Sequence, residues 1–154
     1  MPPPSLIPPF TYTSAHAKVK AAQNLWNTRT PSLIAPAYTP TSLWRNRSTF
    51  LRGHAEIIDF LTKKWEKEKD YRLRKELFAY HENKIAVQFW YEYRDAHDSL
   101  RWKRCYGIEH WTFAEDGKME KRMMSGNDVE IGEEGRWFGE GVDVDEVVLG
   151  ERDF

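Results

Sequence analysis

Residues 71–131 read YRLRKELFAY HEN KIAVQFWYEYRD AHDS LRWKRCYGIEHWTF AEDG KMEKRMMSGNDVEI. Side chains alternate with a period of two in four long runs, and short polar segments separate these runs. Asp116 and Gly117, between the last two runs, are a strong hairpin signal because glycine tolerates the positive φ of a tight turn. The pattern predicts four long strands joined as an antiparallel meander.

Two helices are predicted before these strands. The first runs from Ser14, a suitable N-cap, to about Thr28, with apolar residues at helical spacing. The second follows Gly53, and its inward positions at i, i+3, i+4, i+7 and i+11 are His54, Ile57, Ile58, Leu61 and Trp65. Between the helices, prolines break the periodicity, and residues 41–50 (TSLWRNRSTF) predict a short, irregular strand.

The order of these elements indicates the fold class and the domain limits. Helices precede strands without βαβ alternation, which favours an α+β domain with N-terminal helices packed on a curved antiparallel sheet. Five prolines in residues 1–10 predict an extended arm over residues 1–13. Beyond Ile131 the chain is rich in glycine and acidic residues, which predicts a loosely packed tail. We therefore expect one domain over residues 14–138 and an acidic, glycine-rich tail over residues 139–154.

Composition excludes several classes of function. The chain has 23 basic and 24 acidic residues in 154, which leaves no excess positive charge for nucleic-acid binding. A single cysteine, Cys105, and no zinc-ligand spacing favour a reducing, cytoplasmic location without a bound metal. No apolar run approaches 18 residues, and MPPPSLIPPF lacks the features of a signal peptide, so no membrane association is expected. No GxGxxG or Walker-type loop is present, and we expect no cofactor.

Four segments together resemble an uncharacterised family of the nuclear transport factor 2-like, or SnoaL-like, superfamily. They are WRNRSTFLRGHAEIIDFLTKKW (44–65), YRLRKELFAYHENKIAVQFWYEYRD (71–95), RCYGIEHWTFAEDGKM (104–119) and SGNDVEI (125–131). The resemblance covers roughly residues 14–138. It implies a cone-shaped α+β fold in which helices and the concave face of a bent sheet enclose a pocket, usually in a homodimer.

The superfamily does not imply a single activity, since its members include ketosteroid isomerase, scytalone dehydratase, polyketide cyclases, limonene epoxide hydrolase and non-catalytic adaptors. Two departures from its patterns bear on function. The family strand Y-G-N-E-N-W carries Ile108 and His110 here in place of two amides. The carboxylate base of the isomerase branch corresponds to Arg45 and Asn46, which argues against steroid-isomerase chemistry in that form.

Glu109 is the first candidate catalytic residue. Alternation places it on the same face as Trp111 and Phe113, where desolvation without a cation would raise its pKa toward that of a useful general acid or base. The alternative is a structural ion pair with Arg122 on the adjacent strand. His110 falls on the opposite face, where a surface or dimer-interface role competes with catalysis.

Asp128 is the second candidate base, and its neighbour Asn127 is a candidate for orienting a carbonyl or a water. Related folds place polar pocket groups at this strand end, but an Asx turn would explain the same residues. Tyr106 or Tyr91 is the expected hydrogen-bond donor to the substrate.

The candidate ligand-binding residues are aromatic or basic. Residues 44–47 (Trp44, Arg45, Asn46 and Arg47) place two guanidinium groups beside an indole, and the planar guanidinium suits a carboxylate or phenolate, although a solvated arginine paired with a surface glutamate is equally ordinary. Aromatic side chains at strand and helix spacing either wall a cavity or fill the core. These aromatic candidates are Trp65, Phe89, Tyr91, Tyr93 and Trp111.

Two hypotheses for function follow. The first is a protein that binds a small hydrophobic or aromatic molecule, with the activity of a cofactor-free isomerase, dehydratase or cyclase acting by acid–base catalysis. The second is a non-catalytic, dimeric ligand-binding or interaction module. A homodimer is expected through the outward face of the sheet, where Trp90, Trp102, Tyr106 and Ile108 would otherwise form an exposed apolar patch.

Overall fold

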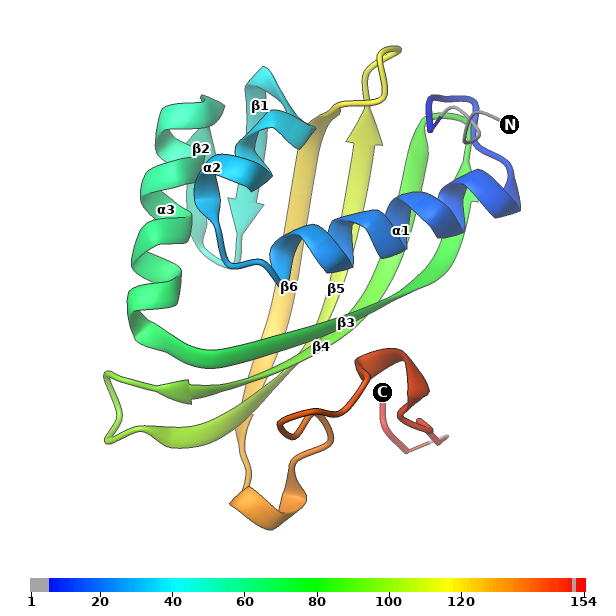
Figure 1. Cartoon of the computed structure of the whole chain (residues 1–154). Coiled ribbons are helices and arrows are strands. Elements are labelled where there is room, and N and C mark those ends of the chain that lie inside the picture. Colours follow the sequence, from blue (N-terminus) through cyan, green and yellow to red (C-terminus); the bar gives the residue numbers. More distant parts are fainter. Residues whose placement is uncertain (1–5, 151) are drawn as a thin grey trace.

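The computed structural model describes residues 6–150 and 152–154, and it confirms the predicted α+β class. Helices pack on one side of a strongly curved, unclosed sheet, which gives the domain the shape of a cone (Figure 1). The helices are α1 (Tyr12–Trp26), α2 (Pro31–Ile34) and α3 (Gly53–Lys67), with short 3-10 turns η1 (Ala35–Ala37), η2 (Glu133–Gly135) and η3 (Val144–Glu146). The strands are β1 (Tyr38–Asn46), β2 (Thr49–Arg52), β3 (Glu68–His81), β4 (Lys84–Asp95), β5 (Arg101–Phe113) and β6 (Met119–Glu130).

The sheet has the strand order β2-β1-β6-β5-β4-β3. Strands β3 to β6 form the predicted antiparallel meander, and Gly117 has the positive φ of 86° that the hairpin signal implied. The sheet is nevertheless mixed, because β1 runs parallel to β6. The predicted irregular strand is in fact a hairpin of β1 and β2, which turns at Arg47 with a φ of 57°.

Helix α1 begins earlier than the sequence predicts. Thr11 is the N-cap, and its side chain accepts the backbone N–H of Ser14 while the Ser14 hydroxyl accepts the N–H of Thr11. Ser14 is therefore the third helical residue of a capping box rather than the cap. None of the helices in the described ranges is long and apolar enough to cross a membrane.

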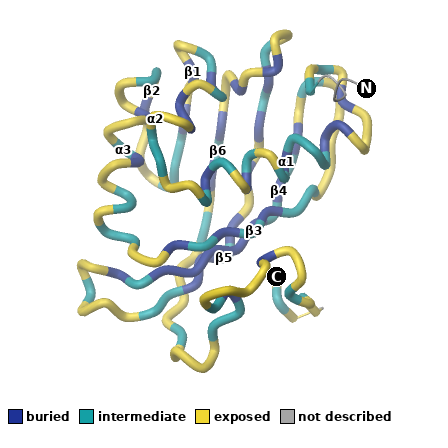
Figure 2. Tube along the Cα trace, viewed as in Figure 1, coloured by how far each residue is buried: buried dark blue, intermediate teal, exposed yellow. Residues whose placement is uncertain are grey.

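The core lies between the helices and the concave face of the sheet, and Figure 2 shows buried residues concentrated along the central strands beneath α1. Aromatic rings join the layers: Trp26 of α1 stacks on Trp44 of β1 and meets the edge of Trp65 of α3. Phe10, which lies within the predicted arm, is buried against Phe113. The part of that arm before Leu6 lies outside the described residues.

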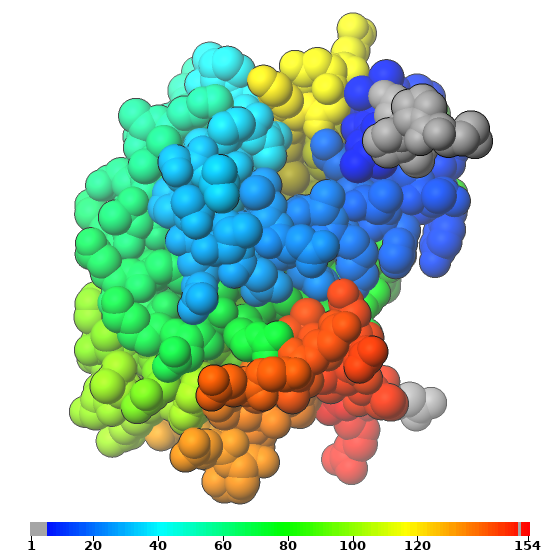
Figure 3. Space-filling model, viewed as in Figure 1, coloured from blue at the N-terminus to red at the C-terminus, as the bar shows by residue number. Residues whose placement is uncertain are grey.

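The C-terminal segment, which comprises residues 132–150 and 152–154, packs more tightly than predicted. Phe138 and Val144 are buried with Trp90 in a second, smaller core on the outer face of the sheet. The buried carboxylate of Glu92 accepts the N–H groups of Trp137 and Phe138, both at 2.9 Å, which satisfies this backbone away from water. The segment lies beside α1 across β3 (Figure 3). It covers Trp90 and packs against Tyr106, so the predicted apolar patch of Trp90, Trp102, Tyr106 and Ile108 is only partly exposed.

The packing of this segment generates a stability test. We expect Phe138→Ala to lower the free energy of unfolding by about 3–5 kcal/mol, because it removes a fully buried ring. Phe154→Ala is the matched control, since Phe154 is 79% exposed, and it should change stability by less than about 0.5 kcal/mol. Urea denaturation measures both. Equal, small effects would show that the segment is not part of the folded unit.

Candidate functional site

Strand β5 places its side chains as alternation predicts. Glu109, Trp111 and Phe113 face the core, whereas Ile108 and His110 are exposed on the outer face. Gly107 allows the Phe89 ring to cross this strand, because a Cβ at Gly107 would lie 1.9 Å from that ring. The inner face of β5 therefore carries the buried chemistry of the domain.

Glu109 is held by cations rather than isolated among rings. Its Oε2 accepts the Arg122 Nε–H at 3.0 Å and the Trp111 indole N–H at 2.6 Å, and its Oε1 accepts the ammonium of Lys75. Burial alone would raise the pKa of Glu109, but Arg122 and Lys75 outweigh it and lower that pKa to about 2. The predicted rise in the pKa of Glu109 was wrong, because Lys75 and Arg122 both contact its carboxylate. The alternative ion pair with Arg122 is present.

Lys75, the second cation that contacts Glu109, was not predicted from the sequence. Its signal was available, since Tyr71, Leu73 and Lys75 occupy alternate positions of β3 and all three are buried. The ammonium lies 4.8 Å from the centre of the Phe89 ring and 5.4 Å from that of Trp111. Burial lowers the pKa of Lys75 to about 8 despite the attraction of Glu109.

A separate pocket of about 560 Å³ opens between α3, the β1–β2 hairpin and the ends of β4 and β6. Its apolar side is formed by Phe50, Leu51 and Phe60. Three predicted site residues, Tyr91, Tyr93 and Asp128, line it together. This is the place where the structure brings candidate catalytic and candidate ligand-binding residues into one cavity.

Arg47 organises the polar wall of this pocket. Its guanidinium pairs with the carboxylate of Asp128 at 2.9 Å and donates to the Gly126 carbonyl at 2.6 Å. It also approaches the Tyr91 hydroxyl at 3.4 Å and the Cys105 sulfur at 3.2 Å. Burial raises the pKa of both Tyr91 and Tyr93, so these phenols stay protonated and remain hydrogen-bond donors.

Lys64 and Glu68 form a second polar pair beside the tyrosines. Their side chains are about nine-tenths buried and 2.9 Å apart. The Lys64 ammonium lies 4.2 Å from the centre of the Tyr91 ring, within the range of a cation–π contact. The sequence reasoning missed Lys64, although it falls on the buried face of α3, three residues after Leu61 and seven after Ile57.

The other predicted site residues lie elsewhere. Trp44, Trp111 and Arg122 are buried around Glu109, and Trp65 packs within the aromatic core against Tyr71. On the outer face of the sheet, Tyr106 is opposite Asn127 and His110 is opposite Met123. Arg45 also points to this face and donates to the Ser125 hydroxyl at 3.2 Å. Tyr106 is thus on the other side of the sheet from Glu109 and Asp128, because side chains alternate along β5.

The charge of Glu109 generates a prediction about acid stability. Its pKa is lowered from an ordinary value of 4.5 to about 2. The ionised carboxylate therefore contributes its full stabilisation of the folded state above pH 4.5, and this stabilisation is lost as the pH falls through 2. The free energy of unfolding of the wild type relative to Glu109→Gln should therefore fall by roughly 3 kcal/mol from pH 6 to pH 2. Urea titrations at both pH values measure the difference. A difference independent of pH would contradict the ion-pair assignment.

Comparison with solved structures places the fold. The chain is similar to the epoxide hydrolase/cyclase-like enzyme SalBIII of pyran ring formation in salinomycin, with a TM-score of 0.66 and 12% identity over 75% of this chain and 92% of that one. AclR, a candidate hydroxylase from Streptomyces galilaeus, has a TM-score of 0.64 and 14% identity over 76% and 77%. An NTF2-like protein of unknown function from Burkholderia pseudomallei has a TM-score of 0.65 and 16% identity over 73% and 90%. At these identities the likeness establishes the nuclear transport factor 2-like, or SnoaL-like, fold alone.

Comparison of the sequence assigns the family. No curated protein matches the chain. One family model matches residues 8–139, which include the strands and α-helices of the described residues and the whole pocket. The chain therefore belongs to the family described as protein of unknown function (DUF1348).

Proposed function

We propose that the chain binds a small hydrophobic or aromatic molecule in the pocket beside α3. We further propose that it acts on this molecule as a cofactor-free isomerase, dehydratase or cyclase, with Asp128 as the general base. The supporting observation is the position of Asp128, a carboxylate that lines the pocket, is 31% exposed and is oriented by Arg47. A base must reach its substrate, and Asp128 has both access and a fixed orientation.

Asp128 is a better candidate than Glu109 for physical reasons. Glu109 is only 2% exposed and is held by three donors, Lys75, Arg122 and Trp111. Both oxygens of Asp128 contact the guanidinium of Arg47, and 31% of the Asp128 side chain is exposed. A carboxylate with a pKa of about 2 is also a weak proton acceptor near neutral pH. We assign Glu109 a structural role and Asp128 the chemical one.

The tyrosines complete the proposed mechanism. Asp128 removes a proton from a carbon next to a carbonyl group of the bound molecule, or from a hydroxyl group. Asp128 holds that proton, and the negative charge develops on the carbonyl oxygen in the first case and on the hydroxyl oxygen in the second. The phenol O–H of Tyr91 or Tyr93 donates a hydrogen bond to that oxygen and stabilises the charge in a partly dehydrated site. The pocket is large enough for this role, since ligand pockets typically measure about 300–1,000 Å³.

Structural relatives give limited support to this proposal. SalBIII is described as an epoxide hydrolase/cyclase-like enzyme, and AclR as a candidate hydroxylase. The description of SalBIII concerns formation of a pyran ring in a polyether, whereas that of AclR names no substrate. Fold likeness does not transfer an activity, so the proposal rests on the pocket of this chain.

A second candidate function is non-catalytic ligand binding. Three carboxylates of the pocket are in ion pairs, because Asp128 contacts Arg47, Glu68 contacts Lys64 and Asp59 contacts Lys63. Such pairs suit a binding site that needs no free base. Saturable binding without turnover would favour this second function.

The two functions are separated by incubating the protein with a metabolite library and following both binding and turnover by mass spectrometry. We expect Asp128→Asn to keep the fold and the bound molecule but to lose turnover, because the amide cannot accept the proton. Glu109→Gln should instead lower stability by about 3–5 kcal/mol, since two buried cations lose their shared partner. Unchanged turnover in folded Asp128→Asn would exclude Asp128 as the base.

We also propose that the chain forms a homodimer through the part of the outer sheet face that its C-terminal segment leaves open. Ile108, near the middle of β5, is 57% exposed there. A second copy would cover this side chain and its neighbours. Sedimentation velocity at micromolar concentration should show a dimer that Ile108→Lys dissociates. Val148→Lys, at a position 92% exposed in the C-terminal segment, should leave the dimer intact. A monomeric wild type would contradict the proposal.

A further inference from the structure

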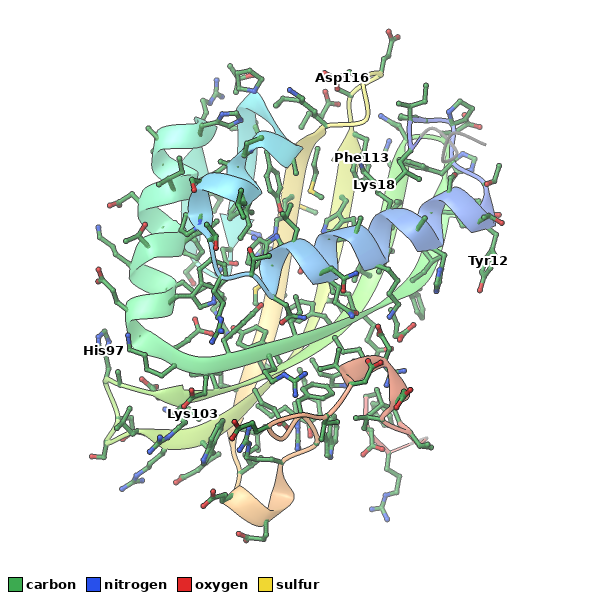
Figure 4. All side chains as sticks on the ribbon, viewed as in Figure 1. Tyr12, Lys18, His97, Lys103, Phe113 and Asp116 are labelled. Atoms are coloured by element: carbon green, nitrogen blue, oxygen red, sulfur yellow. The ribbon has the colours of Figure 1, made fainter. Side chains whose placement is uncertain are left out.

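Charges are unevenly distributed along the helix that borders the pocket. Glu56 lies in the first turn of α3 and Lys67 at its last residue, so the two are separated by about 16 Å along the helix axis. At the Lys67 end, His97 of the β4–β5 turn joins the lining of the pocket. The turn is held against the helix, because the Ala96 N–H donates to the Lys67 carbonyl at 2.8 Å. Figure 4 shows His97 beside this end of α3.

The carboxylates around this end of the pocket are already engaged. Asp95 and Asp98 both contact Lys103, at 2.8 and 3.0 Å. Glu68 is paired with Lys64, and Asp70 with Arg94. Within residues 6–150 and 152–154, no carboxylate oxygen lies within 4.0 Å of a side-chain nitrogen of Lys67 or His97. Asp95 accepts the backbone N–H of His97 at 2.9 Å and feels the charge of Lys67, but it is beyond ion-pair distance of either side chain. Lys67 and His97 can therefore both still contact an anion from outside the chain.

The rest of the pocket has a different chemistry. Phe60 and Leu51 supply an apolar wall, and Tyr91 and Tyr93 supply protonated hydroxyl groups. A molecule that contacts all three parts of the lining needs an acidic group for the Lys67 end, an apolar body for the wall and an oxygen that accepts a hydrogen bond from a tyrosine. Each of these three features matches one part of the lining.

We propose, on the basis of the proposed function, that the ligand is a hydrophobic carboxylic acid that also carries a hydroxyl or carbonyl oxygen. Its carboxylate contacts Lys67 and His97, the two side chains at this end of the pocket that have no carboxylate within ion-pair distance among the described residues. Its apolar body packs on Phe60, and its second oxygen accepts a hydrogen bond from a pocket tyrosine. This arrangement presents the oxygen-bearing end of the ligand to Asp128.

Two probes of the same shape test the charge requirement. Isothermal titration calorimetry compares 6-hydroxy-2-naphthoic acid with its neutral amide, 6-hydroxy-2-naphthamide, at low ionic strength. We expect the acid to bind at least about tenfold more tightly than the amide. Lys67→Gln and His97→Gln should each reduce this ratio several-fold. Lys118→Gln, which removes an exposed charge at the β5–β6 turn, should leave the ratio unchanged.

The outcomes separate this inference from the proposed function. Equal binding of acid and amide, with both weakened by Phe60→Ala, would overturn the charge requirement while keeping the pocket as the binding site. A loss of preference in Lys118→Gln as large as that in Lys67→Gln would also overturn it, since the preference would then come from overall charge. Failure of both probes to bind would count against the charge requirement and the small-molecule function together.

Discussion

The buried carboxylate of Glu109 is the interaction on which the rest of the structure depends. It joins β5 to Lys75 on β3 and to Arg122 on β6, and Arg122 also donates to Asn46 of β1 at 3.1 Å. The Arg122 guanidinium lies over the rings of Trp26 and Trp44, which connects the same cluster to α1. Removing one partner from such a cluster leaves a buried charge uncompensated, so the cluster specifies how four strands and a helix fit together.

The sequence was most informative where local patterns decide structure. Alternation predicted β3 to β6 within a few residues, because each strand has one buried face. The parallel pairing of β1 with β6 was not predictable in this way, since it joins segments far apart in the chain. The C-terminal segment was misjudged for a related reason. Its glycine-rich, acidic composition says nothing of Glu92, which binds its backbone rather than its side chains.

The candidate site was predicted in part for the same physical reason. Tyr91, Tyr93 and Asp128 meet in the pocket, whereas Tyr106, His110 and Asn127 fall on the opposite face of the sheet. A period of two separates the faces of one strand but does not say which strand ends lie beside the helices. The sequence pointed to Arg47 as one of two guanidinium groups for a ligand, but not to its ion pair with Asp128, which depends on the left-handed turn at Arg47.

The parallel contact between β1 and β6 has a consequence for how the chain folds. Asn46 and Arg122 are 76 positions apart, so β1 is synthesised long before the strand that covers its inner edge. Until β6 leaves the ribosome, the β1–β2 hairpin has an unpaired edge and the ring of Trp44 lacks the cation above it. Contacts between residues so far apart in the sequence slow folding, and until they form the unpaired strand edge is exposed and prone to aggregation. The last strand of the meander therefore completes both the sheet and the aromatic cluster around Trp44.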